Sequence, residues 1–447
     1  MTGAPNPESM STGCRRIAEL ARQAPLMSFT TLAHHLDVRL LHEAYQRTRK
    51  DGAAGVDGQT AEDYAVDLMS NLQSLLDRAK SGTYRAPPVR RVHIPKGSGS
   101  ETRPIGIPTF EDKVLQRAVA MILEAIYEQD FLDCSYGFRP GRSAHQALEA
   151  LWRQTTTLGG CWIIEVDIRK FFDTLDHAHL RDLLRRRVRD GVLLRLIGKW
   201  LNAGVLESGT LSYPDQGTPQ GGVISPLLAN VYLHYVLDEW FEGEVKPRLK
   251  GRAFLIRYAD DFVMGFACEE DARKVLEVLP KRFGKYGLTL HPDKTRLVPF
   301  QRPAGPPGAA AGAGSPGSFD FLGFTHHWGR SRRGGWVVTR RTSRSRLGRA
   351  LTKIADWCRR HCHLPLREQH RALWQKLRGH FAYYGITGNV RALQRFRTGV
   401  VGLWRKWLGR RRRAGRVSWA RFAELLKRFP LPPVRVVHSV YGAAAKP

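Results

Sequence analysis

The sequence predicts an α+β protein in which a part that mixes strands with helices is followed by an all-helical, basic tail. Two features predict the strands: residues 89–94 alternate between apolar and polar side chains, and residues 161–168 form a short, mostly apolar run. A third feature predicts the tail, because helical periodicity dominates from residue 343 onward. At 447 residues, the chain is long enough for two or three domains, each with its own core.

The first part is expected to contain helices and one hairpin before the apolar run. Residues 1–15 are small and polar, and we expect them to be disordered. The expected elements, in chain order, are helices over 17–48 and 61–81, strands over 89–94 and 102–107, and a helix over 111–127. The hairpin would carry Lys96 and Arg103 near its tip.

The second part begins with the apolar run, which we interpret as a buried strand. Asp176 is expected to cap the helix that follows it. The further expected elements are helices over 177–189, 227–240 and 269–286, a hairpin over 254–266, a strand over 319–324, and tail helices over 343–361, 369–384, 389–410 and 418–428. Residues 303–318 are rich in Pro, Gly and Ala, which predicts a flexible surface insertion.

The net charge is uneven along the chain. The 71 Lys and Arg residues outnumber the 41 Asp and Glu residues, and residues 340–447 alone carry 27 basic against 3 acidic residues. Such a surface predicts a polyanionic partner, with nucleic acid first and an anionic membrane second. No apolar run approaches the ~18 residues of a membrane span, and the six cysteines form no CxxC pair. Because the N-terminus also lacks an apolar signal core, we expect a cytoplasmic protein without a membrane partner.

Three carboxylates stand out because they accompany apolar strands. Asp167 ends the run at 161–168, where Glu165 shares its face, and Asp260 and Asp261 interrupt the later hairpin. Taken alone, Asp260 and Asp261 are better explained by a solvated turn, and Asp167 is better explained as a partner for the N-terminus of the following helix. Together they would repel one another unless hard cations were bound. Two Mg²⁺ ions held by carboxylates are the arrangement of phosphoryl-transfer enzymes such as polymerases.

The sequence around these carboxylates resembles the bacterial group II intron reverse transcriptase/maturase family. YADD at 258–261 is similar to the signature of reverse transcriptases. The other similar blocks, in the family's order, are RPIGIP at 103–108, YGFRPGRS at 136–143, DIRKFFD at 167–173, GTPQGGVISPLLAN at 217–230, GLTLHPDK at 287–294 and FLGF at 321–324. The resemblance extends from about residue 36 to the C-terminus, and so many ordered blocks make it specific.

The resemblance implies a right-hand polymerase fold with fingers, palm and thumb. Its parts would be an N-terminal segment at 1–35, an extension and fingers at 36–160, the palm at 161–339, a helical and basic thumb or maturase domain at 340–413, and a short DNA-binding-like module at 414–447. Many members of the family also carry a C-terminal HNH endonuclease domain. Nothing similar is found in this sequence, and we expect the type that lacks it.

The resemblance also implies roles for individual residues. Asp167, Asp260 and Asp261 would be the catalytic carboxylates and, with the carbonyl of Ile168, would bind two Mg²⁺ ions, for which Mn²⁺ is a substitute. The residues implied for nucleotide binding are Lys96, Arg103, Phe172, Gln220 and Lys294. The charges of Lys96 and Arg103 suit phosphate, whereas the ring of Phe172 would exclude a 2′-hydroxyl.

The implied function is RNA-directed DNA synthesis for a mobile group II intron, together with binding of the intron RNA to assist its splicing. The expected partners are the intron RNA, an RNA template with a DNA primer, target DNA in the nucleoid, and dNTPs. The basic run Arg410, Arg411, Arg412 and Arg413 is expected to bind nucleic acid. Two alternatives stay open: a non-catalytic RNA-binding splicing cofactor, and a domesticated reverse transcriptase in defence or DNA repair.

Overall fold

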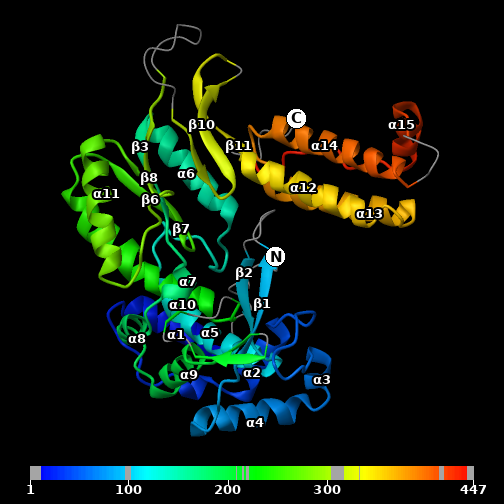
Figure 1. The fold of residues 1–447 in the computed structure, drawn as a ribbon. Coiled ribbons are helices and arrows are strands. Elements are labelled where there is room, and N and C mark those ends of the chain that lie inside the picture. Colours follow the sequence, from blue (N-terminus) through cyan, green and yellow to red (C-terminus); the bar gives the residue numbers. More distant parts are fainter. Residues whose placement is uncertain are drawn as a thin grey trace. The chain divides into compact units, whose positions relative to one another are not determined.

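The computed structural model describes residues 12–95, 102–207, 209–213, 216–217, 221–303, 317–331, 333–411 and 417–439 (Figure 1). The described residues pack as two compact units. Among the described residues, unit 1 holds 12–95, 102–150 and Ile164–Leu297, and unit 2 holds Leu151–Ile163 and those from Val298 onward. Strands and helices mix in the first and helices dominate the second, which confirms the predicted mixed α/β composition.

The N-terminal helices of unit 1 surround one long, buried helix. They are α1 (Thr12–Gln23), α2 (Val38–Arg47), α3 (Ala61–Ala65), α4 (Leu68–Ser81) and the central α5 (Phe110–Asp130). The helix α5 buries residues on every face, and α1 and α2 pack along it. The helix predicted over 17–48 is therefore two helices: the chain leaves α1 before Pro25, and Asp37 caps α2 by accepting from Leu40 N.

The described residues form two four-stranded sheets, the first of which lies within unit 1. The first has the strand order β2-β1-β4-β5 and is built from β1 (Val89–Pro95), β2 (Thr102–Ile107), β4 (Val205–Glu207) and β5 (Thr210–Ser212). The second has the order β6-β7-β3-β8 and is built from β3 (Cys161–Asp167), β6 (Ala253–Tyr258), β7 (Asp261–Phe266) and β8 (Arg296–Phe300). Both predicted hairpins, β1–β2 and β6–β7, are confirmed by their antiparallel registers.

In the described part of the chain, six further α-helices lie between α5 and β8, and the last of them packs on β7 of the second sheet. They are α6 (Ala144–Leu158), α7 (Phe171–Thr174), α8 (His177–Arg185), α9 (Gly191–Leu201), α10 (Ser225–Leu233) and α11 (Glu269–Gly284). The predicted cap is confirmed, since the Asp176 carboxylate accepts from His179 N at 2.8 Å and begins α8. After α10, the chain continues in two π-helical segments, η3 (His234–Asp238) and η4 (Trp240–Val245).

Unit 2 combines a small sheet with four helices. The sheet order is β11-β10-β9, from β9 (Phe319–Phe321), β10 (Phe324–Arg330) and β11 (Trp336–Thr342); the helices are α12 (Arg344–Arg360), α13 (Leu366–Tyr384), α14 (Val390–Gly409) and α15 (Trp419–Arg428). The four predicted tail helices are confirmed. The strand predicted over 319–324 is instead broken at Leu322 and Gly323, whose positive φ values of 49° and 81° form a turn.

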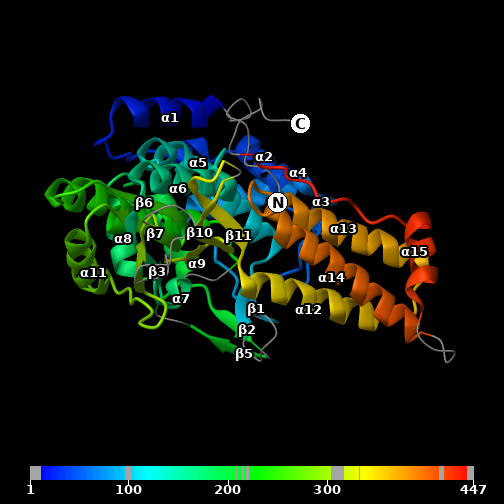
Figure 2. The same cartoon turned by 90° about the horizontal axis from the view of Figure 1, so that it is seen from above.

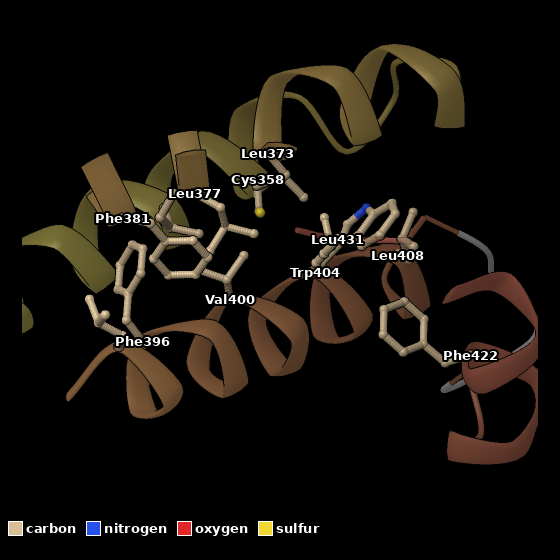
Figure 3. Packing of buried hydrophobic residues seen from close by; sticks show 12 residues of the cluster. Cys358, Leu373, Leu377, Phe381, Phe396, Val400, Trp404, Leu408, Phe422 and Leu431 are labelled. Carbon is tan, nitrogen blue, oxygen red and sulfur yellow. The ribbon is translucent and has the colours of Figure 1, made fainter. Parts of the chain in front are cut away.

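The helices of unit 2 enclose a core of their own. α14 packs against both α12 and α13 (Figure 2). Leu373, Leu377 and Phe381 of α13 recur at every fourth residue and meet Val400 and Trp404 of α14 (Figure 3). The buried indole of Trp404 keeps a hydrogen-bond partner, because its Nε1 donates to Gln369 Oε1 at 3.0 Å.

Two predictions concern segments that are only partly described. Residues 12–15, which were expected to be disordered, begin α1, whereas 1–11 lie outside the described residues. The insertion predicted at 303–318 also lies almost entirely outside them. Within the described ranges, no helix combines the length and apolar character that a membrane span requires.

Candidate active site in unit 1

Asp260 lies in a two-residue turn that is tightly enclosed. The register of β6 and β7 pairs Tyr258 with Asp261, which leaves Ala259 and Asp260 as the turn. Ala259 has a φ of 57°, in the left-handed region that non-glycine residues avoid. A Cβ at Gly137 would lie 2.3 Å from Ala259 N, so only glycine fits beside the turn. Asp260 is half-buried here, and Asp261 begins β7 with an exposed side chain.

Asp167 lies at the end of β3 and is held by a lysine. Lys294 Nζ is 2.7 Å from Asp167 Oδ2, and His291 N donates to the Asp167 carbonyl at 2.8 Å. Two residues earlier on the same strand, Glu165 bonds to Arg296. Asp167 and Glu165, which share one face of β3 because they are two residues apart, therefore pair with Lys294 and Arg296, which are also two residues apart.

The electrostatics link residues that are far apart in the sequence. Burial raises the pKa of Asp260 above its ordinary value; the Asp167 charge raises it further, while the Arg103 guanidinium lowers it. Asp260, in the β6–β7 turn, is therefore influenced by Asp167 of β3 and by Arg103 of β2. The structure brings together four of the residues selected from the sequence: these three and Lys294.

The donor set fits a hard divalent cation through two carboxylates. Asp167 and Asp260 offer the oxygen ligands that Mg²⁺ prefers, and a cation between them would relieve the cost that burial and their repulsion place on Asp260. Among the residues that the structure describes, no group of three or more His, Cys, Asp or Glu side chains is arranged to hold a metal ion. The ligand roles of Asp261 and of the Ile168 carbonyl stay predictions.

Gly217 and Gly221 each lie close to backbone carbonyl groups of neighbouring segments. Gly217 has a φ of 91°, and a Cβ there would lie 2.8 Å from the carbonyl oxygens of both Phe172 and Asp173. Gly221 has a φ of 117°, and its Cβ would lie 2.6 Å from the carbonyl oxygen of Gly106 in β2. Gly217 therefore lies against the segment after Asp167, and Gly221 lies against β2.

The remaining predicted residues are only partly described. The ring of Phe172 is half-buried and packs edge-on against Phe171, with centroids 5.3 Å apart. Arg410 and Arg411 are exposed at the end of α14 in unit 2. Lys96, Gln220, Arg412 and Arg413 lie outside the described residues.

A buried polar pair in α5, which the sequence analysis did not select, supports the same loop. Gln116 Oε1 accepts from Val223 N at 2.8 Å, and Gln116 Nε2 donates to Asp112 Oδ2 at 3.1 Å. Asp112 also accepts from the Tyr84 hydroxyl and from Trp200 Nε1. Burial raises the pKa of Asp112 to about 6, against the opposing effect of these hydrogen bonds. The available signal was two polar residues four apart, which places them on one face of the helix.

The site lies within a segment that matches a known family. Residues 94–326 match the family model described as reverse transcriptase (RNA-dependent DNA polymerase). Protein YkfC of Escherichia coli is 37% identical over 279 residues, which cover 54% of this chain and 71% of that protein. The group II intron-encoded protein LtrA of Lactococcus lactis is 42% identical over 199 residues, 44% of this chain and 32% of LtrA.

A more distant relative comes from a plant. The mitochondrial protein named nuclear intron maturase 2 of Arabidopsis thaliana is 29% identical over 177 residues, 31% of this chain and 24% of that protein. The matched regions therefore span most of YkfC, but only about a third of LtrA and a quarter of the plant protein.

Proposed function

We propose, because this chain belongs to the reverse transcriptase (RNA-dependent DNA polymerase) family, that it copies RNA into DNA at the Asp167–Asp260 site. The observation that carries the proposal is that Asp260 interacts electrostatically with both Asp167 and Arg103, which lie on two other elements of the matched segment. A pair of carboxylates beside an arginine suits a reaction in which charge moves between phosphate oxygens.

In this proposal the fold is a right hand. The sheet β6-β7-β3-β8 belongs to the palm at 161–339, the β1–β2 hairpin to the fingers at 36–160, and helices α12–α14 to the thumb at 340–413. The support is the position of the carboxylates on the palm strands and the separate helical core of unit 2. The segment at 414–447 would be the DNA-binding-like module.

The chemistry proposed is template-directed transfer of a nucleotide. A primer 3′-hydroxyl attacks the α-phosphate of a dNTP, the bond to the β-phosphate breaks, and pyrophosphate leaves. Asp167 and Asp260, with Asp261 and the Ile168 carbonyl, would hold two Mg²⁺ ions, which Mn²⁺ can replace. When bound, such ions make the hydroxyl more acidic and stabilise the leaving oxygen.

The remaining residues would bind and orient the nucleotide. Arg103, exposed on β2 and close enough to influence Asp260, suits a triphosphate because its guanidinium can fork onto two oxygens. Lys294 would exchange its carboxylate partner for a phosphate during the reaction. Phe172 would stack on the sugar and disfavour a 2′-hydroxyl, and Lys96 and Gln220 would complete the pocket.

We also propose that the chain binds a group II intron RNA and assists its splicing, and that it acts on target DNA. The names of LtrA and of the plant maturase support this role, as does the excess of basic residues in the tail. A purely non-catalytic splicing cofactor is not favoured, because the matched segment keeps both interacting carboxylates.

Primer extension tests the proposed synthesis. Wild type and Asp260→Asn are compared on poly(rA)/oligo(dT) with dTTP and Mg²⁺, and RNA binding of both is measured in parallel. We expect extension by the wild type alone, with equal RNA binding. No extension by the wild type, on this template or on an intron RNA that it binds, would contradict the proposal.

Salt dependence tests the RNA-binding role of the tail. The double variant Arg410→Glu/Arg411→Glu should weaken RNA binding and make the salt dependence of log K shallower, by about 1 for each phosphate that the protein no longer neutralises. Unchanged binding and slope would exclude these two arginines from the interface. Extension of a preformed primer–template at saturating concentration should continue.

A further inference from the structure

A fully buried ion pair lies directly beneath the Asp260 turn. The side chains of Arg257 on β6 and Asp238 at the end of η3 are both 0% exposed. Arg257 Nε donates to Asp238 Oδ1 at 2.8 Å, and Arg257 Nη2 donates to Asp238 Oδ2 at 2.5 Å. Because Asp238 outweighs the cost of burial, the pKa of Arg257 is raised and its charge is retained.

The other donors of Arg257 bind the elements that enclose the turn. Nη1 donates to the Ala259 carbonyl at 3.1 Å and to Asn230 Oδ1 at 2.9 Å, and Nη2 donates to Ser135 Oγ at 2.7 Å. With the two bonds to Asp238, all five guanidinium hydrogens have an acceptor. No other side chain offers five donors in one plane, so the geometry requires arginine.

The same network secures the loop that packs on the turn. Asn230 Nδ2 donates to the Gly137 carbonyl at 2.7 Å. The backbone of Arg257 also pairs with the segment before Gly137, since Arg257 N donates to the Cys134 carbonyl and Tyr136 N donates to the Arg257 carbonyl. These hydrogen bonds hold Gly137 against Ala259 and so help to keep Ala259 in its strained left-handed conformation.

We propose that Arg257 is a positioning residue that, with Asp238, fixes the Ala259–Asp260 turn and so determines how tightly the Asp260 carboxylate binds a divalent cation. The inference rests on the proposed function only in taking Asp260 as a cation ligand. Arg257 does not touch the reacting groups; it acts through the Ala259 carbonyl. Partners behind a metal ligand commonly change metal affinity or activity by about 10–100-fold when removed.

The test compares Arg257→Lys with a matched control in the full-length chain. Lysine keeps a charge beside Asp238 but loses the planar fork. The control is Arg187→Lys, because Arg187 forms a comparable pair with Asp130, with side chains 4% and 11% exposed. Arg187 also donates to the backbone carbonyls of Ala24 and Met27, which follow α1 and are far from the Asp260 turn in the sequence.

Mn²⁺ binding, primer extension and RNA binding are measured for each variant. Mn²⁺ is the probe for cation binding, followed by electron paramagnetic resonance of the free ion, and Asp260→Asn defines the binding that belongs to this site. Primer extension gives kcat and the KM for dTTP. For Arg257→Lys we expect about a 10-fold or greater loss of Mn²⁺ affinity and of kcat, with KM and RNA binding unchanged. Arg187→Lys should match the wild type in all four quantities.

The outcomes separate this inference from the proposed function. Equal Mn²⁺ affinity in Arg257→Lys and wild type overturns the inference, and so does an equal loss in both lysine variants. Mn²⁺ binding that Asp260→Asn does not change overturns it as well. A wild type that binds Mn²⁺ through Asp260 but extends no primer contradicts the proposed function, while the Mn²⁺ comparison still decides the role of Arg257.

A milder variant keeps the inference testable if Arg257→Lys does not fold. Ser135→Ala removes one acceptor of the guanidinium and leaves the ion pair with Asp238 in place. We expect a smaller loss of Mn²⁺ affinity and kcat in the same direction, with unchanged KM. Wild-type values for both quantities in a folded Ser135→Ala variant would overturn the inference.

Discussion

The two candidate carboxylates lie in or beside ion pairs that differ in how far they are buried. Arg257 and Asp238, beneath the Asp260 turn, are 0% exposed, whereas Lys294 and Asp167, at the end of β3, have side chains 56% and 45% exposed. A buried pair cannot be replaced by water without a large cost, but an exposed pair is screened and exchanges readily. One carboxylate is therefore fixed in position, and the other is held by a replaceable cation.

The largest expected effect comes from breaking the buried pair. Arg257→Met leaves the Asp238 charge buried without its partner and should lower the free energy of unfolding by about 3–5 kcal/mol. Urea denaturation measures this loss. The double variant Arg257→Met/Asp238→Leu, which removes both charges, should recover much of it; a single variant as stable as the wild type would show that the pair is not essential for stability.

The second-largest effect concerns Asp112, a buried acid whose side-chain donors Tyr84, Trp200 and Gln116 are all neutral. The pKa of Asp112 is about 6 in the folded protein, above its value of about 4 when unfolded, so the folded state takes up the proton first. The resulting stabilisation is complete below about pH 4 and is lost as the pH rises through about 6. Between these limits it should change by about 3 kcal/mol or less.

Asp112→Asn isolates this contribution from those of other titrating groups. The free energy of unfolding of the wild type minus that of the variant should decrease as the pH is raised through the pKa of about 6. Urea denaturation at a series of pH values measures the difference. A constant difference would show that Asp112 has the same pKa in both states, and an increase would reverse the sign argued here.

The smallest expected effect comes from the exposed pair. Because both side chains are about half exposed, Lys294→Ala should change the free energy of unfolding by less than about 1 kcal/mol. Primer extension should nevertheless be slower, since alanine cannot bind the phosphate that Lys294 is proposed to hold. A stability loss as large as that of Arg257→Met would remove the contrast between the two pairs.

The sequence predicted the elements whose patterns are local. The alternation of β1–β2, the apolar run of β3, the Asp176 cap and the tail helices all follow from residues within a few positions of one another. The β10–β11 hairpin was missed for a physical reason. Its inward positions include His326 and Arg340, which pair across the strands and are 0% and 2% exposed, so the polar–apolar alternation is concealed.

In the candidate site, too, residues with a local sequence signal were predicted and residues that depend on distant partners were not. Asp167 and Asp260 were predicted because their blocks resemble a family, and the structure shows that they interact. Arg257 and Gln116 were not predicted, because their partners lie up to 122 residues away for Arg257 and 108 for Gln116. Buried polar residues are selected by what surrounds them in the fold, and single-sequence patterns do not contain that information.

The Asp112–Gln116 hydrogen bond has a consequence for how the neighbouring loop is specified. An amide is nearly symmetric in shape, but an ionised carboxylate only accepts, so the NH₂ group of Gln116 must face Asp112 and its oxygen must face Val223 N. Asp112 thus fixes which atom of the Gln116 amide faces the backbone of the loop. Protonation of Asp112 would remove its part of this constraint, because a carboxylic acid can donate to the amide oxygen as well as accept from the amide nitrogen.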